Sequence, residues 1–141
     1  MRYVLAVVAI LGTPASASAN TVAAQALNSL RADAGLDAVR FSVQLESAAE
    51  AHATDMAQGG FFEHTGSDGS DVAARVSRTG YGWCIVAENI AKGQADLDEV
   101  MRAWAGSDGH RRNMLSREVS EFALVQGPDL IWVMVLARPG C

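Results

Sequence analysis

The sequence lacks the features of several protein classes. Beyond residue 11 it has no apolar run of membrane length, and no stripe of Lys and Arg side chains marks one face of the chain. Its 16 acidic residues outnumber its 11 basic ones, which gives a formal net charge of −5 at pH 7. It also has no internal repeat and no low-complexity linker after the N-terminal segment. We therefore expect one soluble domain without a transmembrane segment, and the charge argues against nucleic acid as a partner.

The first residues have the pattern of an export signal. Arg2 supplies a positive charge, the apolar stretch from Tyr3 to Leu11 is too short to span a bilayer, and Ala17-Ser18-Ala19 is a small-residue cleavage site. The alternative is a buried N-terminal helix, but a proline interrupts it. We predict a signal peptide over residues 1–19, a single domain over residues 20–141, and an extracytoplasmic location, either periplasmic or secreted.

Only two cysteines are present, Cys84 and Cys141. An oxidising compartment favours a bridge between them, and two cysteines allow one intramolecular pairing. Two free thiols are the alternative. We predict the disulfide, which would hold the C-terminus and stabilise the fold by up to about 4 kcal/mol in the chain-entropy model.

Hydrophobic periodicity and turn residues indicate helices, a strand, another helix and a final hairpin. Apolar residues at three- and four-residue spacing predict helices, and short apolar runs bounded by Gly, Pro and Asp predict strands. The predicted helices cover residues 21–34, 43–58, 71–79 and 97–105, with a further helical turn near His110, and the predicted strands lie within 84–91 and on both sides of the turn at 127–129. This order predicts an α+β fold in which helices cover a small, mostly antiparallel sheet.

Two short polar motifs follow His64, which lies in a loop rich in Gly, Ser, Thr and Asp. They are Ala87-Glu88-Asn89-Ile90-Ala91 and Trp104-x-x-Ser107-x-x-His110-Arg111-x-Asn113-Met114-Leu115. With a terminal apolar hairpin that contains Trp132, they resemble the bacterial CAP (SCP-like) domain family, named after cysteine-rich secretory proteins, antigen five and plant pathogenesis-related proteins. The resemblance runs from about Ala26 to the C-terminus and implies an α-β-α sandwich with a central cleft.

Members of that family often place two histidines and two acidic residues in the cleft. The resemblance implies that His64, Glu88 and His110 occupy three of these positions, whereas Ser107 stands where the second acidic residue is expected. Two imidazoles and one carboxylate are a reasonable ligand set for Zn²⁺, with a fourth position left for water or substrate, while Mg²⁺ prefers oxygen ligands. The alternative is a hydrogen-bonded network of the same side chains that ties two loops to the sheet.

Four further residues support the predicted site. We expect Asn89 and Asn113 to hydrogen-bond to backbone around the cleft, and Trp104 to lie on the buried stripe of its helix. Arg111 could meet an anionic ligand, although solvent or a carboxylate is its more common partner. His52 falls on the apolar face of the second helix, where a histidine is more often a hydrogen-bonded core residue than a ligand, so we leave it out of the site.

The pattern favours binding over catalysis. We predict that the protein binds a small ligand, either a lipid or a divalent metal, or a partner through the cleft of His64, Glu88 and His110, since some CAP proteins bind sterols or fatty acids. A zinc-assisted hydrolase in the same cleft is the alternative, and a purely structural role is a third. Ser107, His110 and Glu88 contain the residue types of a serine hydrolase, but no G-x-S-x-G motif surrounds Ser107, where a hydroxyl more often caps the next helical turn.

Overall fold

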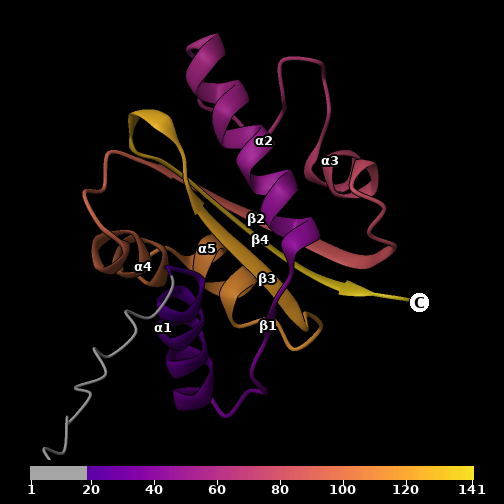
Figure 1. Cartoon of the computed structure of the whole chain (residues 1–141). Coiled ribbons are helices and arrows are strands. Elements are labelled where there is room, and N and C mark those ends of the chain that lie inside the picture. The colour runs from indigo at the N-terminus through magenta and orange to yellow at the C-terminus, as the bar shows by residue number, and fades with distance from the viewer. Residues whose placement is uncertain (1–18) are drawn as a thin grey trace, which may run out of the picture.

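The computed structural model describes residues 19–141, which form helices on both sides of one sheet (Figure 1). The predicted signal peptide lies outside the described residues except for Ala19, so its cleavage stays a prediction. The elements in chain order are α1 (Ala19–Asp33), β1 (Arg40–Phe41), α2 (Val43–Gly59), α3 (Val72–Arg78), β2 (Trp83–Lys92), α4 (Leu97–Ala105), α5 (Asp108–Met114), β3 (Glu121–Gln126), the 3-10 turn η1 (Pro128–Leu130) and β4 (Ile131–Pro139).

The four strands form one mixed sheet in the order β1-β3-β4-β2. β4 pairs antiparallel with both β2 and β3, whereas β1 pairs parallel with β3. This arrangement confirms the predicted small, mostly antiparallel sheet. β1 was not predicted, because two residues are too few to show a strand periodicity. β2 lies at one end of the sheet, so one of its edges is free of strand pairing within the described residues.

The sheet separates two hydrophobic layers, and β4 contributes to both. Trp132, Met134 and Leu136 pack in the layer formed with α1, α4 and α5, while the residues between them pack in the layer formed with α2 and α3. This follows from the alternation of side chains along a strand. Every residue from 131 to 137 is buried, as expected for a strand covered on both faces. Figure 1 shows the two groups of helices on opposite sides of the sheet, so the predicted α-β-α sandwich is confirmed.

Local capping chemistry sets the ends of α2, the longest helix in the described residues. The Ser42 side chain accepts a hydrogen bond from the backbone of Leu45 at 3.3 Å, which satisfies a free N–H of the first turn. At the other end, Gly60 has a φ of 65° and its N–H donates to Met56, so the helix ends in the left-handed conformation that glycine adopts at low cost. Both ends agree with the sequence prediction.

A disulfide joins Cys84 on β2 to Cys141, as predicted, with the two Cα atoms 5.1 Å apart. It closes a loop over 57 positions, and this fixes the last residues of the chain beside the start of β2. Within residues 19–141, none of the helices has the combination of length and apolar character that crossing a membrane requires.

Candidate functional site

β2 positions the candidate site because its neighbouring residues face opposite layers. Glu88 points toward the layer of α2 and α3, where it meets Arg75. Asn89, the next residue, points toward α5, where its side chain donates to the backbone carbonyl of His110 at 3.1 Å. The alternation of a strand therefore divides the candidate residues into two groups, which we call the Glu88 cluster and the His110 cleft.

The Glu88 cluster consists of Glu88, His52, His64 and Arg75. The Glu88 side chain is only 2% exposed, yet both of its oxygens have partners. Oε1 accepts a hydrogen bond from Nδ1 of His64 at 2.8 Å, and Oε2 accepts one from Nη2 of Arg75 at 2.9 Å. A buried carboxylate needs such partners because desolvation penalises its charge. Arg75 also donates to the carbonyl of Ser70 at 2.8 Å, so the cluster ties α3 and the loop before it to the sheet.

His52 is the fully buried member of the cluster. Its Nε2 donates to the carbonyl of Glu63 at 2.9 Å and lies 3.8 Å from Oε1 of Glu88, while its Nδ1 has no hydrogen-bond partner among residues 19–141. Burial lowers the pKa of His52, and the Glu88 carboxylate offsets part of this effect. The prediction of a hydrogen-bonded core histidine is confirmed. Because His52 also holds the backbone next to His64, it belongs with the cluster.

Arg75 was missed in the sequence. It is 6% exposed and forms the only ion pair to Glu88 from an arginine within the described residues. A signal was present: Arg75 lies three residues after Val72 and next to buried Val76, which places it on the apolar side of α3. A charged residue at such a position requires a buried partner, but the sequence does not indicate which acidic residue provides it.

The His110 cleft lies beside the free edge of β2 and has a volume of about 510 Å³. The indole nitrogen of Trp104 donates to the carbonyl of Ile90 at 3.2 Å, which attaches α4 to the strand below the cleft. The ring of His110 lies 6.4 Å from that of Trp104, measured between centroids. The residues that line the cleft are Phe62, Ile90, Ala91, Lys92, Gln94, Ala103, Trp104, Ser107 and His110.

His110 is held by its neighbours and keeps a mainly neutral ring near pH 7. Its Nδ1 lies 3.0 Å from the hydroxyl oxygen of Ser107, and Asn113 supports the same region by donating to Oδ1 of Asn89 at 2.8 Å. Burial lowers the pKa of His110, and the neighbouring imidazole of His64 adds to this effect. The two predicted histidines belong to different groups of contacts, since His64 bonds to Glu88 and His110 meets Ser107.

Ser107 has a different role from the one that its position suggested. It is the N-cap residue of α5, yet its side chain makes no capping hydrogen bond. The expectation that its hydroxyl caps the helix is therefore wrong, because the hydroxyl meets the imidazole of His110 instead. Asn113 contacts the backbone as expected, at 3.4 Å from the carbonyl of Glu88.

The predicted residues do not assemble into a catalytic triad or a metal site as they lie. No hydrogen bond joins Glu88 to His110 within residues 19–141, so a triad with Ser107 lacks its acid. In the same range, no group of three His, Cys, Asp or Glu side chains is arranged to hold a metal ion. Zinc binding would require Glu88 to exchange a contact with His64 or Arg75 for the ion, and it stays a prediction.

Arg111 lies outside the His110 cleft. It is exposed and lines a separate surface hollow with Asp108, Arg112 and Leu115. Phe62, Lys92 and Gln94, in contrast, line the cleft but were not predicted as site residues. The apolar pair Phe61-Phe62, which is separated from His64 only by Glu63, was a signal for Phe62. Lys92 and Gln94 had no such signal, because they line the cleft only as a result of β2 lying at the edge of the sheet, which the sequence does not show.

Known proteins resemble this chain in both sequence and fold. The bacterial relative YkwD of Bacillus subtilis, described as an uncharacterized protein, is 33% identical over 89 residues, which is 63% of this chain and 35% of that protein. The chain thus spans about a third of the length of this curated relative.

Solved structures with low sequence identity share the fold. An extracellular protein with an SCP domain from Bacillus anthracis strain Ames superposes with a TM-score of 0.80 at 23% identity, covering 84% of this chain and 40% of that one. An outer surface protein of Borrelia burgdorferi gives 0.76 at 19% identity, covering 84% and 91% of the two chains. A cysteine-rich secretory protein of Staphylococcus aureus gives 0.68 at 15% identity, covering 86% and 40%.

The family assignment depends on the sequence match, because these structural likenesses show the fold alone. The sequence profile described as "CAP: Cysteine-rich secretory protein family" matches residues 24–128, which include α2, both motifs and the His110 cleft. This is more than half of the chain, and it agrees with the resemblance found in the motifs. The chain therefore belongs to the CAP, or cysteine-rich secretory protein, family.

Proposed function

We propose that the protein binds a small ligand with an apolar body and an anionic end, such as a fatty acid, in the His110 cleft. The observation that carries this proposal is the cleft itself. Its volume of about 510 Å³ falls within the range of roughly 300–1,000 Å³ that is typical of small-molecule sites. Its lining also combines apolar side chains with a few polar groups, which is the usual composition of such sites.

The apolar part of the cleft suits an acyl chain. Phe62 is 42% exposed, although a large aromatic side chain gains free energy when it is covered. Beside it lie Ile90, Ala91 and Trp104. A ligand that covers Phe62 would remove apolar surface from water on both partners, and this supports an apolar body for the ligand.

The polar end of the cleft suits a carboxylate. Lys92 and His110 line it together with Ser107, and no acidic residue among the described residues 19–141 belongs to its lining. Lys92 forms no ion pair within residues 19–141. A carboxylate placed there would gain a positive charge and hydrogen-bond donors, which orient the ligand.

The test is a titration of the protein with a fluorescent fatty acid, dansyl-undecanoic acid, followed by competition with palmitate. We expect saturable binding that Phe62→Ala weakens about tenfold, since the variant removes the apolar surface that the ligand covers. The matched control is Phe41→Ala, because Phe41 is 37% exposed and lies outside the cleft. Absence of saturable binding, or equal weakening by both variants, would contradict the proposal.

A hydrolase that uses Ser107 in the same cleft is the second candidate function. The contact between Ser107 and His110 supplies a hydroxyl and a base, but Glu88 is bonded to His64 and Arg75 and cannot orient the His110 ring. Ester and peptide substrates added to the wild-type protein would reveal turnover. Turnover that Ser107→Ala abolishes would replace the binding proposal with a catalytic one.

A further inference from the structure

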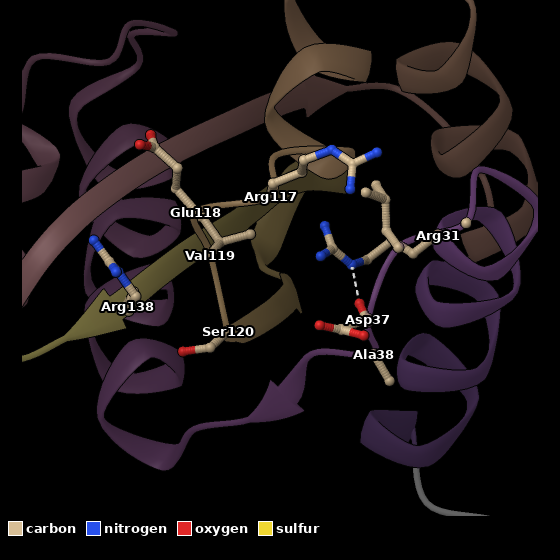
Figure 2. Close-up of a pocket in the computed structure, with 10 residues that line it drawn as sticks. Arg31, Asp37, Ala38, Arg117, Glu118, Val119, Ser120 and Arg138 are labelled. Carbon is tan, nitrogen blue, oxygen red and sulfur yellow. Dashed lines mark hydrogen bonds between the residues drawn. The ribbon is translucent and has the colours of Figure 1, made fainter.

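A second pocket lies away from the His110 cleft and shares no residue with it. Its volume is about 240 Å³, and it is formed by the turn after α1 (residues 35–38) and the segment before β3 (residues 117–120), together with Arg31 of α1 and Arg138 of β4. Figure 2 shows the guanidinium groups of Arg31 and Arg117 on one side of this pocket and Arg138 on the other. We call it the arginine pocket.

Arg31 is the fixed part of the arginine pocket. It is 1% exposed, which is rare for an arginine unless its charge has partners. Nε donates to the carbonyl of Asp37 at 2.8 Å, and Nη1 donates to the carbonyls of Met114 and Ser116 at 2.8 and 2.9 Å. These acceptors orient the guanidinium group and satisfy the end of α5, but they are neutral and leave its positive charge in place.

The other two arginines have no structural partner that explains their position. Arg117 forms no hydrogen bond or ion pair with the part of the chain that the structure describes, and Arg138 contacts only the sulfur of Cys84, at 3.4 Å. Sulfur is a weak acceptor, so this contact does not satisfy a guanidinium group. Both side chains are free to turn toward a ligand.

The carboxylates of the pocket offset only part of its charge: Asp37 raises the pKa of Arg31, although burial lowers it more. Asp37 and Glu118 also line it, but none of the ion pairs found within residues 19–141 joins either of them to an arginine of the pocket. Three arginines against two carboxylates leave one positive charge in a chain whose formal net charge is −5. Several guanidinium groups around one small space are the arrangement that binds oxyanions through paired hydrogen bonds.

We propose that the arginine pocket binds a small oxyanion, either a phosphate group or a carboxylate. Arg31 provides the rigid contact, and Arg117 and Arg138 complete it from the rim. The pocket has less than half the volume of the His110 cleft, so it suits a free anion or a head group and not an acyl chain. This proposal is independent of the proposed function, because the two sites share no residue.

The experiment follows backbone amide shifts of the ¹⁵N-labelled protein during titration with inorganic phosphate, and separately with acetate and glycerol phosphate. Sodium chloride holds the ionic strength constant, so that general screening is equal in all samples. We expect saturable shifts in residues 35–38 and 117–120. Saturation by phosphate or glycerol phosphate alone would specify a tetrahedral anion, free or esterified, and saturation by acetate alone would specify a carboxylate.

Variants with equal charge distinguish a site from general attraction. Arg117→Gln and Arg138→Gln each remove one exposed guanidinium group from the pocket, and Arg102→Gln removes one elsewhere, on the exposed face of α4 where it pairs with Asp98. We expect about fivefold weaker binding in each pocket variant, the size of one partly exposed charge contact, and no change in Arg102→Gln. Linear shifts without saturation, or equal weakening in all three variants, would overturn the proposal.

Discussion

The Glu88 cluster and the His110 cleft begin from adjacent residues of β2, yet they differ in how far their charged groups are buried and paired. In the cluster, both oxygens of Glu88 have charged or imidazole partners, and its side chain is 2% exposed. In the cleft, His110 is half-buried, Lys92 is exposed without an ion pair in the described residues, and Phe62 faces solvent.

This difference separates two roles, stabilising the fold and binding a ligand, whose residues are neighbours in the sequence motif. A buried carboxylate with a partner on each oxygen stabilises one arrangement of the chain, whereas exposed apolar and polar groups around a hollow leave free energy to be gained from a ligand. We infer that Glu88 and its partners hold the site in place and that the cleft performs the binding. Replacements in the cluster should therefore change stability more than affinity, and replacements in the cleft should do the opposite.

The largest effect is expected from Glu88→Gln. The amide keeps the shape of the side chain but leaves the buried guanidinium group of Arg75 without a negative partner, which costs about 3 kcal/mol or more. Urea unfolding monitored by circular dichroism measures the difference in the free energy of unfolding. Glu50→Gln, on the exposed face of α2, is the control and should change it by less than about 0.5 kcal/mol.

A double variant tests the cause of that loss. Glu88→Leu combined with Arg75→Met removes both charges and retains similar volumes, so it should be more stable than Glu88→Gln alone, because no unpaired charge remains. If the double variant is less stable than Glu88→Gln, the damage comes from packing and the cluster is not held together by its charges.

Local features of the sequence predicted most of the fold, and long-range features were missed. Ser42 and Gly60 set the ends of α2 through chemistry within one turn of the helix, so their residue types were sufficient. Arg75 and Glu88 are 13 residues apart and meet only because α3 packs on β2, and no rule of spacing contains that contact. The same holds for the cleft, whose lining comes from the loop of Phe62, the end of β2, the helix α4 and the start of α5. The motifs identified candidate residues but not the division between the cluster and the cleft.

The second prediction concerns pH. Burial lowers the folded-state pKa of His52, so below its ordinary value of 6.5 the unfolded chain takes up a proton that the folded chain does not, and stability falls as the pH falls. Above pH 6.5 both states are neutral and the effect disappears. Urea unfolding between pH 7.5 and 5 should show a loss that approaches about 1.4 kcal/mol per pH unit for one proton.

Variants of the histidines show which residue causes this dependence of the unfolding free energy on pH. His52→Gln should remove more of it than His110→Gln, because His52 is fully buried while His110 is half-buried, although the pKa of both is lowered. An unchanged slope in His52→Gln would show that another group controls the loss and would weaken the case for a neutral His52 in the cluster.

The third prediction compares alanine variants of the two candidate site histidines. The His64 side chain is 60% exposed, so losing its contact with Glu88 in His64→Ala should cost only about 0.5–1 kcal/mol of stability. His110→Ala should cost less, because the bond from Asn89 goes to the backbone and survives, but it should weaken binding of dansyl-undecanoic acid about tenfold. Equal losses of affinity in the two variants would mean that the cluster and the cleft form one binding site.

The smallest effect is expected from Ser107→Ala. An N-cap serine that bonds to its helix contributes about 1 kcal/mol, and Ser42→Ala should show a loss of that size because its hydroxyl accepts from Leu45. Ser107 makes no such bond, so its replacement should cost less than about 0.5 kcal/mol in the same unfolding assay. The two variants make the same chemical change at the same position of a helix, and the difference between them isolates the capping bond. Since the hydroxyl of Ser107 meets His110 instead, a near-neutral effect on stability would indicate that this serine belongs to the cleft and not to the framework that the cluster holds in place.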